Sequence, residues 1–188
     1  MATTTTAPQE TDLPVGTWQI DPVHSSLEFQ VRNMGLVTVK GFFADFEGSL
    51  EVDEDGQARA AGTVQAASVH TRSEKRDEHL RAPDFFDVEQ HPEVTFRSTG
   101  VELADDGTAR LDGELTIAGV TRPVAIAGTW AEPVPAAGGG LRAGLELAAV
   151  LDRRDFGFEW QMELPGGGDA LAYDVTLEVS LQLIQPEA

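Results

Sequence analysis

Residues 173–183 read YDVTLEVSLQL, and this stretch decides the fold class. From Tyr173 to Leu183, a large apolar residue stands at every second position and a polar or charged residue stands between. Side chains on a β-strand point alternately to the two faces of a sheet, so this period is typical of a strand with one buried face. The stretch therefore predicts a strand whose apolar face packs into an interior.

The same alternation repeats along most of the chain, and short turns separate the repeats. Asp53 to Gly56 and Asp105 to Gly107 are turn sequences, because glycine adopts positive φ without strain. Short turns place neighbouring strands antiparallel, and an even series with one apolar face favours a closed up-and-down barrel. We predict an all-β, eight-stranded antiparallel barrel; a two-sheet sandwich is the alternative. The other alternating stretches are residues 27–31, 42–52, 60–69, 94–103, 109–117, 124–130 and 145–151.

One short helix interrupts the strands. Thr71 is followed three residues later by Glu74, a spacing that lets each side chain satisfy a free backbone N–H at a helix start. Pro83 ends the helix, because its ring pushes Ala82 out of the α region. The sequence therefore predicts a single inserted helix of about ten residues, which is marginal alone in water.

Leu80, Phe85 and Phe86 are the large apolar residues at the end of this helix. In one interpretation the helix is a connector, and Phe85 or Phe86 anchors it to the core. In the other, the helix covers the mouth of an apolar cavity. The sequence leaves both open.

The predicted inward face favours a cavity because many of its residues are small. A barrel of eight strands has an interior that side chains just fill or that holds one small ligand. Phe43 breaks the alternation of its stretch, which indicates a bulge near Gly41 or one exposed ring. The small residues on the apolar face are Gly48, Gly62, Ala66, Gly113, Gly128 and Ala149.

The net charge and the hydrophobic content of the chain limit which molecules we expect it to bind. The chain has 188 residues, of which 41% are hydrophobic, and its formal net charge is −19. Such a charge excludes nucleic acid and anionic lipid headgroups as main partners, and no run of about 18 apolar residues predicts a membrane span. We expect one domain over residues 15–188, after a disordered polar tail at 1–14. The tail lacks a basic start and an apolar segment, so we expect a cytoplasmic protein.

No pattern in the sequence indicates catalysis, a metal or a cofactor. The chain contains no cysteine, and its four histidines lack metal-ligand spacing. A Ser–His pair adjacent in sequence, as at His24 and Ser25, is not the arrangement of a nucleophile and its base. Residues 153–157, RRDFG, form either an ion pair that closes a turn or a site where an arginine meets the polar end of a ligand.

Several motifs, in order, resemble the YceI-like polyisoprenoid-binding proteins. They are DPVHSS at 21–26, VKGFF at 39–43, the segment 73–96, LTIAGVTRPV at 115–124 and RDFG at 154–157. The resemblance runs from about Thr17 to the last strand. It implies a lipocalin-like barrel that binds a long isoprenoid or similar amphipathic lipid for storage or transport, without catalysis. An enzyme of lipid or quinone metabolism in the same barrel, with His24 or His79 as acid–base group, is the alternative function.

This interpretation assigns candidate residues. The resemblance also shows three departures from the usual pattern, at Asn33, His70 and Ala118, which concern contacts with a ligand's polar head. Whether the protein forms a homodimer stays open. The candidates for the polar head are His79, Arg81, Arg122 and Arg154. The candidate apolar ligand-binding residues are Phe29, Val31, Phe42, Phe46, Leu50, Leu80, Phe85, Phe86, Phe96, Leu115, Ile126, Trp130, Phe156, Val175, Leu177 and Val179.

Overall fold

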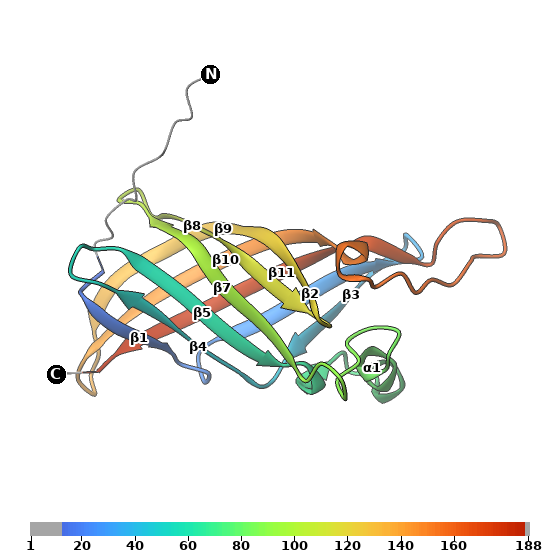
Figure 1. Cartoon of the computed structure of the whole chain (residues 1–188), viewed down its shortest axis with the longest axis horizontal. Helices are drawn as coiled ribbons and strands as arrows, with labels where there is room; N and C mark the ends of the chain where they lie inside the picture. The colour runs from blue at the N-terminus through green and yellow to red at the C-terminus, as the bar shows by residue number, and fades with distance from the viewer. Residues whose placement is uncertain (1–12, 187–188) are drawn as a thin grey trace, which may run out of the picture.

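A computed structural model describes residues 13–186, in which a single sheet of eleven strands carries the fold (Figure 1). The helical elements are η1 (Ala66–Ser68), α1 (Glu74–Arg81) and η2 (Arg153–Phe156). The strands are β1 (Gly16–Ile20), β2 (Ser26–Asn33), β3 (Val37–Phe43), β4 (Phe46–Val52), β5 (Ala58–Gln65), β6 (Val69–His70), β7 (Glu93–Leu103), β8 (Thr108–Ile117), β9 (Val120–Pro135), β10 (Leu141–Asp152) and β11 (Leu171–Gln185).

The sheet closes into an antiparallel barrel because β1 pairs with β4 on one side and with β11 on the other. The pairs β1–β2, β3–β4 and β5–β6 each run as one interrupted strand. On β11, for example, Leu183 pairs with Ile20 of β1, and Ser180 pairs with Ser26 of β2. With each pair counted once, eleven strands make eight, which confirms the predicted barrel. The closure excludes the sandwich.

The three interruptions lie side by side and form a crease across the barrel wall, at residues 21–25, 44–45 and 66–68. Within the crease, Ala44 N donates to Ser68 O at 3.2 Å, and Gln65 N donates to Asp45 O at 2.9 Å. These bonds join neighbouring loops where the regular ladder stops. The crease divides the part of the wall that β1 to β6 form into two halves with their own strand pairings, whereas β7 to β11 are not interrupted.

One end of the barrel is filled with side chains, and we call it the closed end. Trp18 is fully buried there, and Trp130 is 7% exposed. Trp18 Nε1 donates to Pro14 O at 3.0 Å, and Trp130 Nε1 donates to Ala104 O at 2.8 Å, so each buried indole N–H has a partner. The indoles pack with Leu50, Leu103, Leu111, Leu145, Leu147 and Leu183.

The opposite end, which we call the mouth, is less regular. The ladder between β9 and β10 ends at the pair Ala127–Ala148, although β9 starts at Val120 and β10 continues to Asp152. Helix α1 and the segment between η2 and β11 lie at this end (Figure 1). We call that segment, residues 157–170, the strap.

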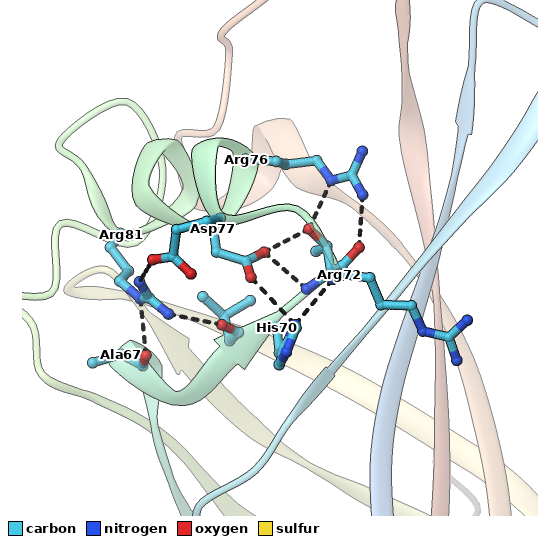
Figure 2. Close-up of polar contacts among 9 residues, drawn as sticks. Ala67, His70, Arg72, Arg76, Asp77 and Arg81 are labelled. Carbon is cyan, nitrogen blue, oxygen red and sulfur yellow. Dashed lines mark hydrogen bonds and ion pairs between the residues drawn. The ribbon is translucent and has the colours of Figure 1, made fainter.

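The inserted helix ends as predicted and starts differently. Ala82 is extended, with φ −73° and ψ 168°, directly before Pro83. The predicted reciprocal cap between Thr71 and Glu74 is wrong, because Ser73 is the N-cap residue and its side chain makes no capping bond. Instead Asp77 holds the chain before the helix: Thr71 N and Thr71 Oγ1 donate to Asp77 Oδ1 at 2.8 and 2.5 Å (Figure 2).

Residues 1–12 of the predicted tail lie outside the described residues. Leu13 is buried in the core at the closed end, and Pro14 accepts the bond from Trp18. Leu13 and Pro14, which we expected in the tail, therefore pack with the barrel. Within residues 13–186, no helix has the length and apolar character to cross a membrane.

Candidate functional site

An apolar cavity of about 280 Å³ occupies the barrel between the closed end and the mouth. This volume approaches the lower end of the range of ligand pockets. All the predicted apolar residues except Phe42 and Trp130 line it. They come from strands around the barrel, from α1 and the segment after it, and from η2, and they are Phe29, Val31, Phe46, Leu50, Leu80, Phe85, Phe86, Phe96, Leu115, Ile126, Phe156, Val175, Leu177 and Val179.

Small residues contribute to the space in two ways. Ala60 and Gly62 of β5 face the cavity, where larger side chains would fill it, whereas Ala61 between them is exposed on the outer face. At Gly41, by contrast, an added Cβ would lie 2.3 Å from the ring of Phe29, so the glycine makes room for that ring. Glycines on the inward face therefore do not all enlarge the cavity.

Phe42 is a correction to the predicted lining, because β3 presents Phe43 to the interior instead. Phe43 lines the cavity, whereas the ring of Phe42 is 38% exposed and stacks on His70 at 5.2 Å between ring centroids. Phe46 also points inward, three residues after Phe43. The crease at 44–45 adds the extra residue between them, which shifts the alternation of β3 relative to β4.

Trp130 is the second correction. It alternates correctly with Ile126 and Gly128, but β9 is long, and Trp130 lies at the closed end in the packed core. Its side chain therefore helps to seal the barrel and does not line the cavity.

Aromatic rings close the mouth, and two of them were not predicted. Phe158 and Trp160 of the strap lie against residues that follow α1. The ring of Phe158 contacts Phe85 at 5.7 Å and Phe86 at 5.2 Å in edge-to-face geometry. Phe86 also meets Phe43 at 5.6 Å. These contacts join the strap to the segment after α1 directly over the cavity.

Sequence reasoning missed Phe158 and Trp160 because they follow Gly157, outside any strand. A signal was present: Phe156, Phe158 and Trp160 stand at every second position, the same period that marks the strands. The lid interpretation of α1 fits this geometry, with the strap as a second part of the cover.

The four predicted polar-head residues do not line the cavity. His79 Nε2 lies 2.9 Å from Asp84 Oδ2, and the His79 ring contacts Trp160 at 4.9 Å on the outer side of the aromatic group. Arg122 is exposed and bonds to its neighbour's carbonyl, Thr121 O.

Arg81 and Arg154 have structural partners. Arg81 donates to Ala67 O at 3.0 Å and Val69 O at 3.2 Å, which ties α1 to β6 (Figure 2). Arg154 Nη2 donates to Asp152 Oδ2 at 2.5 Å. This bond lowers the pKa of Asp152 to about 2 and raises the pKa of Arg154. Arg154 of RRDFG therefore forms an ion pair, as one alternative from the sequence had it, but its partner Asp152 precedes the motif.

Arg153, the neighbouring residue, is the cation at the cavity wall. It is 5% exposed, and burial lowers its pKa, although a guanidinium stays charged in proteins. Its guanidinium donates to Ala172 O at 2.9 Å and Trp160 O at 2.9 Å. Further bonds reach Leu171 O at 3.2 Å and Phe158 O. Arg153 thus fastens the strap to β11 and sets the positions of Phe158 and Trp160.

The three departures from the family pattern lie at ends of elements near the mouth. Asn33 pairs with Leu171 at the end of β2, and Ala118 has φ 47° in the β8–β9 turn. His70 Nδ1 lies 3.3 Å from Asp77 Oδ2 (Figure 2). None of the three lines the cavity.

Among the described residues, the cavity lining has no pair of convergent titratable groups of the kind that acid–base chemistry needs. Glu28 and Glu47 border it, but cross-strand partners share a face, and Glu28 pairs with the outward Phe42. Glu47 follows the inward Phe46, so it points outward too. His24 is held by Asp21 at 2.7 Å, away from the lining. Within residues 13–186, no group of three acidic or histidine side chains could hold a metal.

The profile of the YceI-like domain matches residues 18–183. The chain belongs to the YceI-like family. A relative from Pseudomonas aeruginosa, a UPF0312 protein, is 37% identical to this YceI-like chain over 141 residues, which cover 74% of this chain and 73% of the relative.

Solved structures agree with the YceI-like assignment. The YCEI protein of Campylobacter jejuni is 27% identical, with a TM-score of 0.68 over 81% of this chain and 88% of that one. A polyisoprenoid binding domain from Saccharophagus degradans, implicated in plant cell wall breakdown, has a TM-score of 0.65 over 92% of this chain and all of its own. Its identity is 15%, so this likeness concerns the fold.

Proposed function

We propose that this YceI-like protein binds an isoprenoid or similar long-chain amphipathic lipid in the barrel cavity, for storage or transport. The observation that carries the proposal is an apolar cavity, sealed at one end by Trp18 and Trp130 and covered at the other by aromatic rings. Membership of the family and the likeness to a polyisoprenoid binding domain support it.

The shape of the cavity sets the direction of the ligand. Because the closed end is packed, the apolar chain enters first and the polar head stays near the mouth. Each CH₂ group moved from water into such a cavity contributes about 0.8 kcal/mol. A chain of about 15 carbons therefore gains on the order of 10 kcal/mol before ordering costs, and needs no charged anchor.

Binding without catalysis is the simpler use of this site. The donors of Arg153, the cation at the wall, point to backbone carbonyls of the strap and β11. The lining contains no acid–base pair among the described residues. The cavity therefore offers a ligand apolar contact and few polar groups to react with.

Solvent extraction of the purified protein, followed by mass spectrometry, tests the proposal. We expect about one long-chain lipid per protein chain. The matched variant is Leu177→Glu, which places a carboxylate in the lining, where burial without a partner is costly. We expect this variant to lose the lipid or to fail to fold. A folded Leu177→Glu protein with unchanged lipid content, or a wild-type protein that carries no lipid after exposure to isoprenoid, would contradict the proposal.

A further inference from the structure

Exposed apolar side chains gather beside the mouth, on the turn between β2 and β3 and on the strap. Leu36 is 74% exposed, Val37 56%, Met34 44% and Met162 54%. Backbone bonds hold the two segments together: Met34 N donates to Ala170 O at 2.5 Å, and Ala170 N donates to Met162 O at 3.0 Å. We call Met34, Leu36, Val37 and Met162 the apolar tip.

The backbone at Met34 is a second observation on the tip. Met34 has φ 54° and Gly35 has φ 67°, and Leu36 N donates to Asn33 O at 3.0 Å. In such a turn the first positive-φ position favours asparagine, aspartate or glycine. A methionine there is strained, and its exposed side chain gains little from packing in the isolated protein. An apolar surface outside the protein would compensate for that strain.

Charge distinguishes the tip from the rest of the surface. The chain has a net charge of −19, yet residues 29–44 contain no aspartate or glutamate. Arg32 and Lys40 are exposed on this hairpin, and Arg32 Nη2 donates to Gly35 O at 2.6 Å. Phosphate groups repel the acidic parts of the surface, so this hairpin approaches a headgroup layer with less repulsion than they do.

The tip is continuous with the cover of the cavity. Met162 follows Trp160 by two residues on the strap, and the strap holds Phe158 over the cavity. A lipid that leaves through water exposes its whole chain, at about 0.8 kcal/mol for each CH₂. Contact between the mouth and a bilayer avoids that exposure.

We propose that the apolar tip docks on the surface of a lipid bilayer. Met34, Leu36 and Met162 insert among the acyl chains, while Arg32 and Lys40 lie at the level of the phosphates. The strap carboxylates Glu159, Glu163 and Asp169 oppose tight binding to anionic bilayers, so insertion into a zwitterionic surface dominates and the docking is reversible. The inference rests on the proposed function, because it names the bilayer as the place where the cavity exchanges its lipid.

The test compares two variants of the full chain. Met34→Asn with Leu36→Ser removes two exposed apolar side chains and puts asparagine where the turn favours it, so the fold is kept. The control is Val134→Ser, which removes an apolar side chain of 58% exposure near the closed end of the barrel. Binding to phosphatidylcholine vesicles, with and without phosphatidylglycerol, is measured by co-sedimentation, and lipid content by mass spectrometry.

We expect wild type and Val134→Ser to bind phosphatidylcholine vesicles equally, and the double variant to bind at least about tenfold more weakly. All three proteins should hold the same lipid. Equal binding by the double variant, no binding by wild type, or a dimer that forms through the tip in place of vesicle binding would overturn the inference. Vesicle binding by a protein without lipid would overturn the proposed function alone, and lipid without vesicle binding would overturn the docking alone.

Discussion

The closed end and the mouth belong to the same barrel, but different interactions hold them together. At the closed end, fully buried side chains such as Trp18 pack in a continuous apolar core, and the β9–β10 ladder continues to the pair Leu141–Pro135 with one irregularity between Arg142 and Gly144. At the mouth that ladder stops. There, hydrogen bonds from Arg153 and Arg81 and the edge-to-face contact of Phe86 with Phe158 hold the strap, β11 and α1 in place. We therefore expect the mouth to open more readily than the closed end, whose core keeps the barrel folded.

The largest difference should appear when one aromatic ring is removed from the closed end. Trp18→Ala leaves a cavity at a fully buried site, and we expect it to lower the free energy of unfolding by about 3–5 kcal/mol. Urea denaturation followed by circular dichroism measures this. A loss below that of a mouth substitution would show that the closed end does not dominate stability.

Phe86→Ala makes the equivalent change at the mouth. The ring of Phe86 is partly buried between Phe43 and Phe158, so we expect a loss below about 3 kcal/mol, together with faster release of lipid. Transfer of a fluorescent lipid to acceptor vesicles measures the release rate. Phe42→Ala, which removes an outward ring, is the matched control and should leave release unchanged. Equal release by both variants would leave α1 and the strap as connectors.

Acid should weaken the Asp152–Arg154 pair at the mouth. The folded-state pKa of Asp152 is about 2, below its usual value of about 3.9, so the pair stabilises the fold at pH 4 and above and loses its effect as the pH falls to about 2. The difference in urea midpoint between wild type and Asp152→Asn should therefore be constant above pH 4 and close between pH 4 and 2. Arg154 is exposed and Asp152 is half-buried, so solvent screens the pair and the difference is small. If the difference in urea midpoint between the two proteins grew as the pH fell, it would contradict a lowered pKa of Asp152 in the folded state.

Salt should have the smallest effect. If burial of the chain supplies the affinity, the dissociation constant for a neutral isoprenoid should stay nearly constant between low and high ionic strength, because screening acts on charges. Fluorescence titration at several salt concentrations measures it. A steep weakening with salt would instead indicate that Arg81, Arg122 or Arg154 grips an anionic head, and would contradict the placement of these residues away from the cavity.

Regular strands made most of the lining predictable. Val175, Leu177 and Val179 keep strict alternation on β11, so their common face followed from the period alone. The same rule failed at Phe42, because the crease lies between β3 and β4 and one added residue reverses the faces. Trp130 obeyed the rule, but periodicity gives the face of a residue and not its height along the barrel.

The cover of the mouth was less predictable, because its contacts join segments far apart in the chain. Arg153 and Arg154 are adjacent and identical in type, yet one is buried on carbonyls and the other is exposed beside Asp152. Which of the two arginines is buried depends on where the strap and β11 lie in the folded chain. The Thr71–Glu74 spacing matched a helix cap, but the N-cap residue is Ser73, two residues later than that cap requires. The Thr71 hydroxyl donates to Asp77 instead.

The crease limits how far a change in one part of the wall spreads. In an uninterrupted strand, an inserted residue turns every later side chain to the opposite face. Here residues 44–45 and 66–68 stand outside the ladders, so an extra residue there is absorbed as a longer loop. The pairings Leu50–Ala60 and Phe43–Val69 lie on opposite sides of that boundary. Evolution or engineering can thus change the length of these loops near the mouth while the strand pairings at the closed end keep their register.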